Sequence, residues 1–156
     1  MTLFKRSQPD AQIGKYALHC WWIRVLGMQT ITPYLYYEDV DAALEWLGRV
    51  FGLEEYGERF TGPDGKTKHA AMKLKDGVVM MGCPGGSYRN PKRMGQATQC
   101  LHVMVSDVDE RFERAKKAGA VILHPPEDKF YGVRQFGAAD LEGHEWYFAQ
   151  EIKKTS

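Results

Sequence analysis

The stretch 33–52, PYLYYEDVDAALEWLGRVFG, recurs in outline at 102–119, HVMVSDVDERFERAKKAG. Each copy has a short apolar run with strand character, an Asp-Val-Asp triplet, and an amphipathic segment that ends at glycine. The offset that separates Asp39 from Asp107 also separates Glu45 from Glu113. A constant offset between equivalent residues is typical of a duplicated supersecondary unit.

Both copies carry signals for the start and the end of a helix. Asp39 and Asp107 suit N-cap positions, where a side-chain oxygen accepts a backbone N–H of the first turn. Gly52 and Gly119 supply the backbone freedom that a C-terminal cap requires. Turn residues then separate further runs rich in β-branched and aromatic side chains. We therefore predict an α+β fold built from two tandem βαβββ modules.

These patterns divide the chain into four segments. Residues 28–84 are expected to form the first module and residues 98–152 the second, joined by a linker over 85–97 that is rich in glycine, proline and basic residues. Residues 1–27 do not match the repeat, and their apolar run is too short and too polar to span a membrane. We expect an N-terminal extension there, disordered or upstream of the natural start.

The charge balance and the cysteines of the chain limit which partners and which cell compartment fit the protein. The 156 residues carry 21 basic and 20 acidic side chains that are mixed along the chain, so there is no basic stripe for nucleic acid or for an anionic membrane surface. The three cysteines form no CxxC pair and leave an odd one over. This usage favours reduced thiols and a cytoplasmic location.

The paired modules, together with the turn D-x-E-G-H at 140–144, resemble the vicinal oxygen chelate superfamily of glyoxalases, extradiol dioxygenases and bleomycin-resistance proteins. The resemblance covers about residues 29–150. It implies that the sheets of the two modules curl around one shared pocket, and that the protein is a homodimer.

In metal-dependent members of that superfamily, the first and last strands of each module provide the ligands. The equivalent positions here are occupied by Thr32, Met81, Cys100 and Tyr147. A divalent first-row metal prefers imidazole, carboxylate or thiolate donors, and this set offers at most one. We therefore expect neither a bound metal nor another cofactor.

A displaced metal site is the alternative. His102 lies two residues after Cys100, and Glu145 lies two residues before Tyr147. Side chains two residues apart share one face of a strand, so this pair could serve in place of the usual positions. A buried histidine hydrogen-bonded to a carboxylate is the simpler interpretation of the same pair.

Alternation along the strands assigns further side chains to the pocket face. The face is predicted to be apolar and aromatic with a few polar groups, as small-molecule sites usually are, although such residues also occur in ordinary cores. Its predicted members are Thr32, Tyr34, Tyr36, Met81, Cys100, His102, Met104, Glu145 and Tyr147. Arg134, near the expected mouth, could pair with a ligand carboxylate or phosphate, or form an exposed salt bridge. His124, in front of two prolines, is expected to be solvated.

Three functions fit these predictions. The first is a binding protein that holds a small aromatic or apolar ligand in the cleft between the modules by stacking on Tyr34, Tyr36 and Tyr147. The second is an enzyme, either a metal-dependent glyoxalase-type lyase or dioxygenase, or a metal-free catalyst in which His102 and Glu145 transfer protons. The third is a dimeric scaffold whose cleft is filled by side chains. We rank them in that order.

Overall fold

The computed structural model describes residues 29–152, and the residues from Pro33 onward belong to one compact unit. The predicted extension over 1–27 lies outside the described residues. The first module contains β1 (Tyr34–Tyr36), α2 (Val40–Phe51), β2 (Glu54–Glu55), β3 (Phe60–Thr61), β4 (Thr67–Leu74) and β5 (Gly77–Gly82). After α3 (Pro91–Met94) in the linker, the second contains β6 (Cys100–Met104), α4 (Val108–Lys117), β7 (Val121–Lys129), β8 (Val133–Ala139) and β9 (Glu145–Glu151).

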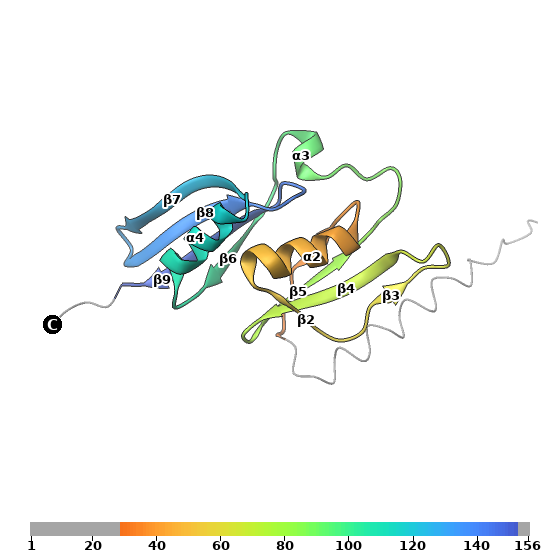
Figure 1. Cartoon of the computed structure of the whole chain (residues 1–156), viewed down its shortest axis with the longest axis horizontal. Helices are drawn as coiled ribbons and strands as arrows, with labels where there is room; N and C mark the ends of the chain where they lie inside the picture. The colour runs from red at the N-terminus through yellow and green to blue at the C-terminus, as the bar shows by residue number, and fades with distance from the viewer. Residues whose placement is uncertain (1–28, 153–156) are drawn as a thin grey trace, which may run out of the picture. The chain divides into compact units, whose positions relative to one another are not determined.

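Each module forms its own mixed sheet (Figure 1). The first has the strand order β1-β5-β4-β2, with β3 also paired to β4, and the second has the order β6-β9-β8-β7. In both sheets the first strand pairs in parallel with the last strand of the module, and the remaining pairs are antiparallel. The predicted α+β fold of two repeated modules is confirmed.

Helix α2 begins and ends as its sequence predicts. The Asp39 carboxylate accepts the backbone N–H of Ala42 at 3.0 Å, and Gly52 adopts a left-handed conformation with φ of 72°. Helix α4 differs, because Asp107 makes no side-chain cap. Its carboxylate instead accepts from the Arg111 guanidinium at 2.8 Å, within the same turn.

The two modules share one hydrophobic core. Phe51, at the end of α2, packs edge-on against Phe148 of β9 with ring centroids 4.9 Å apart. Two arginines of α4 also reach α2: Arg111 donates to the Phe51 carbonyl at 2.8 Å, and Arg114 to the Gly48 carbonyl at 3.0 Å. Because the last carbonyls of a helix lack partners within it, these guanidinium groups satisfy α2 from the second module.

One strand begins later than predicted. The strand expected around Thr32 begins only at Tyr34, immediately after Pro33, whose ring removes a backbone donor. The stretch around Pro125 and Pro126 lies within β7, where the pairing with β8 is irregular on both sides of His124. Such irregularities accommodate residues that cannot donate to the sheet.

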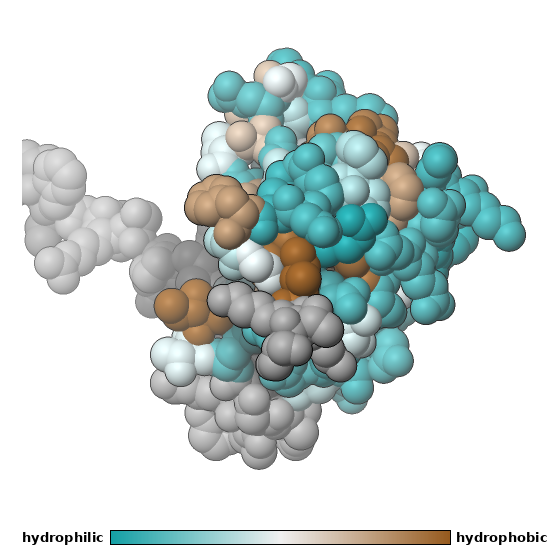
Figure 2. Space-filling model, turned by 90° about the vertical axis from the view of Figure 1, so that its left-hand side faces the viewer, coloured by the Kyte–Doolittle hydropathy of each residue, from teal (hydrophilic) through white to brown (hydrophobic). Residues whose placement is uncertain are grey.

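Exposed surface on the side of the unit seen in Figure 2 is mainly hydrophilic, with small apolar patches. Among residues 29–152, no helix combines the length and the apolar character that crossing a membrane requires.

Candidate functional site

Exposed aromatic rings cover one face of the first sheet. Tyr34 and Tyr36 of β1 are 41% and 50% exposed, and their rings meet edge-on with centroids 5.5 Å apart. The Tyr88 ring extends this row at 5.9 Å from Tyr36, and its hydroxyl donates to the Tyr36 carbonyl at 2.8 Å. Burial, with the negative charges of Glu142 and Glu38, raises the pKa of Tyr88 to about 12.

A glycine allows Tyr34 to lie flat on the sheet. The Tyr34 ring covers Gly82, so closely that any side chain at that position would collide with it. The Tyr34 hydroxyl lies 2.9 Å from Nδ1 of His69, and the two rings are stacked. We call the residues Tyr34, Tyr36, His69 and Tyr88 the tyrosine face.

The second sheet presents its own open face. Cys100, His102 and Met104 of β6 are exposed on it, as the alternation predicts. In the parallel pairing with β9, Cys100 lies opposite Glu145 and His102 opposite Tyr147. The Tyr147 hydroxyl donates to the Glu145 carboxylate at 3.0 Å. Partial burial and this hydrogen bond raise the pKa of Tyr147.

His124 joins this second face, and its side chain, 24% exposed, is half-buried rather than fully solvated. Its ring lies over Gly137 and beside Tyr147, with ring centroids 5.5 Å apart. Across the sheet, His102, Tyr147, Gly137 and His124 occupy one row on four adjacent strands. The absence of a side chain at Gly137 leaves the space that the imidazole fills.

Met81 was predicted for the pocket face but is fully buried in the core. It pairs with Leu35, another core residue, whereas its neighbour Met80 pairs with Tyr34. An alignment of Gly77 with Gly143 makes Met81 equivalent to Tyr147, but Gly77 is paired within β5 while Gly143 lies in the longer turn before β9. This shift of one residue reverses the face, because side chains alternate along a strand.

Two other predicted residues have local partners. Thr32 precedes the compact unit, and its hydroxyl makes a long contact of 3.4 Å with the Gln29 carbonyl. Of the two roles considered for Arg134, the structure shows the salt bridge. Its guanidinium contacts the carboxylates of Asp109 at 3.0 Å and Asp128 at 2.9 Å. These two carboxylates raise the pKa of Arg134 and occupy the donors that a ligand anion would need.

The side chains that could bind a metal ion do not cluster among the described residues. No three His, Cys, Asp or Glu side chains converge on a common point within residues 29–152. His102 and Glu145 lie on adjacent strands of one face, but the Glu145 carboxylate bonds to Tyr147.

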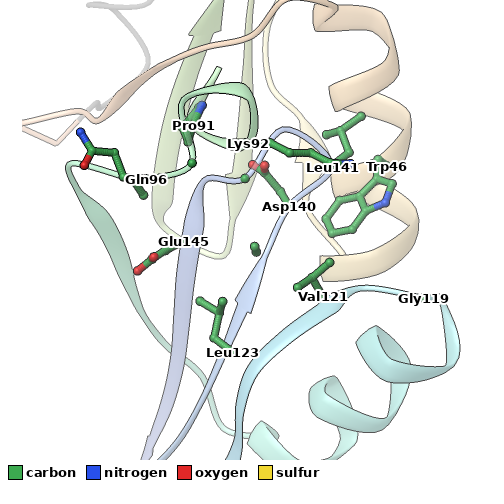
Figure 3. A pocket seen from close by; sticks show the side chains of 14 residues that line it. Trp46, Pro91, Lys92, Gln96, Gly119, Val121, Leu123, Asp140, Leu141 and Glu145 are labelled. Carbon is green, nitrogen blue, oxygen red and sulfur yellow. The ribbon is translucent and has the colours of Figure 1, made fainter. Parts of the chain in front are cut away.

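A cavity of about 580 Å³ lies at one end of the second sheet (Figure 3). Strands β7, β8 and β9 contribute Val121, Ala139 and Glu145, while Trp46 comes from α2 and the α3 segment forms another wall. Of the residues predicted for the site, Glu145 alone lines this cavity. The residues of the tyrosine face therefore lie outside this cavity, whereas the face of the second sheet contributes Glu145 to it.

A buried polar cluster joins the modules at the D-x-E-G-H turn. The Asp140 carboxylate accepts from the Tyr37 hydroxyl at 2.7 Å and from the Trp146 indole at 3.1 Å. The Glu142 carboxylate accepts the backbone N–H groups of Glu38 and Asp39 at 2.8 to 3.0 Å. We call Asp140, Glu142 and Tyr37 the clasp. Its acidic residues were visible in the turn motif, but their partners lie about a hundred residues away in the sequence.

Comparison with known proteins agrees with this architecture. The model of the Glyoxalase/Bleomycin resistance protein/Dioxygenase superfamily matches residues 27–148. The chain belongs to this superfamily. An uncharacterized protein of Mycobacterium tuberculosis, Rv0887c, is 33% identical over 132 residues, which cover 81% of this chain and 76% of that protein.

Solved structures of the superfamily share the fold. TioX from Micromonospora sp. ML1 is 37% identical, with a TM-score of 0.62 over 80% of this chain and 99% of its own. FosX, a fosfomycin resistance protein of Listeria monocytogenes, is 15% identical, with a TM-score of 0.59 over 81% of this chain and 96% of its own. At that identity, the likeness to FosX concerns the fold alone. Function in a superfamily as varied as this one has to be argued from the site.

Proposed function

We propose that the chain is a binding protein for a small aromatic or apolar ligand, acting in the cytoplasm as a homodimer and without a resident metal. The exposed pair Tyr34 and Tyr36 carries this proposal. Tyrosine rings left half in water offer stacking surface and hydrogen-bonding hydroxyls together. The Tyr36 hydroxyl has no hydrogen-bond partner among the described residues, and it is therefore available to a ligand.

The openness of both faces supports the proposed homodimer. Met104, on the second face, is 47% exposed, much like the tyrosines of the first. Large apolar side chains gathered on an open sheet face favour a partner surface. A second copy that sets its second face against the tyrosine face of the first would enclose a ligand between them.

A neutral fluorescent probe, N-phenylnaphthylamine, tests the stacking site. We expect its emission to rise on binding, and the Tyr36→Ala variant to bind roughly five- to tenfold more weakly because a stacking partner is lost. Tyr131→Ala, which removes an exposed tyrosine of the β7–β8 hairpin, is the matched control. Equal affinity in both variants would contradict the proposal. Light scattering should give the mass of a dimer.

The metal-dependent enzyme is the competing function, and the exposed imidazole of His102 on the same face as Glu145 favours it. Metal content per chain, measured after purification without chelators, separates the two. Stoichiometric metal that is lost in a His102→Ala variant would replace our proposal. Absence of metal from both proteins is the result we expect.

A further inference from the structure

The 580 Å³ cavity has the size and the walls of a ligand site. Sites for small molecules usually enclose about 300 to 1,000 Å³ and are mostly apolar, with a few polar groups. Here Trp46 and Leu141 stand on one side and Glu145 with Gln96 on the other, as Figure 3 shows. The cavity therefore joins an aromatic ring to a carboxylate.

Apolar side chains of the edge strand form its floor. Val121 and Leu123 of β7 are 62% and 41% exposed although both line the cavity. Covering them with a ligand would remove apolar surface from water at a gain of about 25 cal/mol per Å². Val121, Ala139 and Glu145 lie opposite one another on three adjacent strands, so the floor extends roughly 10 Å from the valine to the carboxylate. This length suits a flat molecule of two or three fused rings.

Two charged side chains on different walls of the cavity could meet a ligand: Lys92, in the α3 segment, and Glu145, at the end of the floor. Glu145 is half-buried, and one of its oxygens accepts from the Tyr147 hydroxyl. Among the described residues, no basic side chain forms an ion pair with it. Its second oxygen can therefore accept from a ligand, and a bond between ions is stronger than one between neutral groups.

We infer that this cavity binds a flat aromatic cation, such as a fused-ring amine, with the rings between Trp46 and the β7 floor and the amino group on Glu145. The inference is independent of the proposed function, because none of Tyr34, Tyr36, His69 and Tyr88 lines this cavity. It goes further by assigning the ligand a positive charge and by placing it in the cavity below α3.

Proflavine, a fluorescent three-ring cation, and acridone, its neutral relative, test the charge preference by fluorescence anisotropy. We expect the full chain to bind proflavine, and Glu145→Gln to weaken that binding about tenfold while acridone binding is unchanged. Glutamine retains an acceptor for the Tyr147 hydroxyl, so the face is preserved. Glu151→Gln removes the same charge from the exposed end of β9 and should leave both affinities unchanged.

The Val121→Ala variant tests the location. We expect it to weaken both dyes about threefold, since exposed apolar floor is lost without disturbing the core, whereas Ile152→Ala, beyond β9, should have no effect. Proflavine that fails to bind, or that binds equally well to Glu145→Gln, would overturn the inference. If Tyr36→Ala still weakened the binding of N-phenylnaphthylamine in that case, the proposed function would stand without the cation site. If Tyr36→Ala had no such effect while Glu145→Gln weakened proflavine binding, the cation site would stand without the stacking site.

Discussion

The Tyr37 hydroxyl donates a 2.7 Å hydrogen bond to the Asp140 carboxylate, and both residues are buried where the two modules meet. Tyr37 precedes α2 in the first module, whereas Asp140 follows β8 in the second. The same carboxylate also accepts from the backbone of Glu142 and His144, each at 3.0 Å. A buried carboxylate is tolerated only when such donors replace its water. The contact between the modules is therefore polar as well as hydrophobic.

Replacing Tyr37 by phenylalanine should lower the free energy of unfolding by about 2 kcal/mol, because one donor to a buried carboxylate is lost. Urea denaturation measures the change. Tyr36→Phe removes an exposed hydroxyl from the adjacent residue and should change stability by less than about 0.5 kcal/mol. If Tyr37→Phe destabilised the protein no more than Tyr36→Phe does, the hydrogen bond from Tyr37 to Asp140 would add no stability.

Stability should also fall at alkaline pH. Burial, together with the nearby Asp140 carboxylate, raises the pKa of Tyr37 well above its usual value. A raised pKa in the folded state contributes stability that is complete below the unfolded value of about 10 and is lost as pH rises towards the folded value. Tyr88, with its pKa raised to about 12, acts in the same direction. Urea midpoints between about pH 9 and pH 11 should decline less steeply for Tyr37→Phe than for wild type, and parallel declines would contradict this cause.

Glu142 should stabilise the start of α2. Its carboxylate accepts N–H groups of Glu38 and Asp39, which precede the helix, and the Asn90 amide at 3.1 Å. Glu142→Gln removes the charge and leaves one acceptor oxygen, so we expect a loss of about 1–3 kcal/mol in the free energy of unfolding. Glu45→Gln, on the exposed surface of the same helix, is the control and should be near neutral. A control variant as unstable as Glu142→Gln would refute the specific role of the clasp.

The neighbouring methionines Met80 and Met81 test the register of β5. Met81→Ala should cost about 2–5 kcal/mol in the free energy of unfolding, because a fully buried side chain leaves a cavity. Met80, on the half-buried opposite face beside Tyr34, should cost less than half as much when changed to alanine. Met80→Ala should instead weaken N-phenylnaphthylamine binding. A larger loss of stability in Met80→Ala than in Met81→Ala would mean that Met80, and not Met81, faces the core.

The sequence by itself determined the repeated strand–helix order, the limits of α2 and the outward positions of Tyr34, Tyr36, Cys100, His102 and Met104. These features depend on local signals, namely capping residues, glycine and strict alternation, which act over a few residues. The failure at Met81 has a local cause as well: a turn of different length shifted the alignment by one residue, and alternation turned that small error into the wrong face.

Only the tertiary structure decided which distant groups meet. The contacts of Tyr37 with Asp140, of His124 with Tyr147, and of Arg134 with its two aspartates depend on how strands pair and modules dock. The cavity between Trp46 and Glu145 likewise draws on α2, the α3 segment and the second sheet. No periodicity within one segment encodes such contacts, because they are selected by the packing of side chains and the satisfaction of buried polar groups across the whole unit.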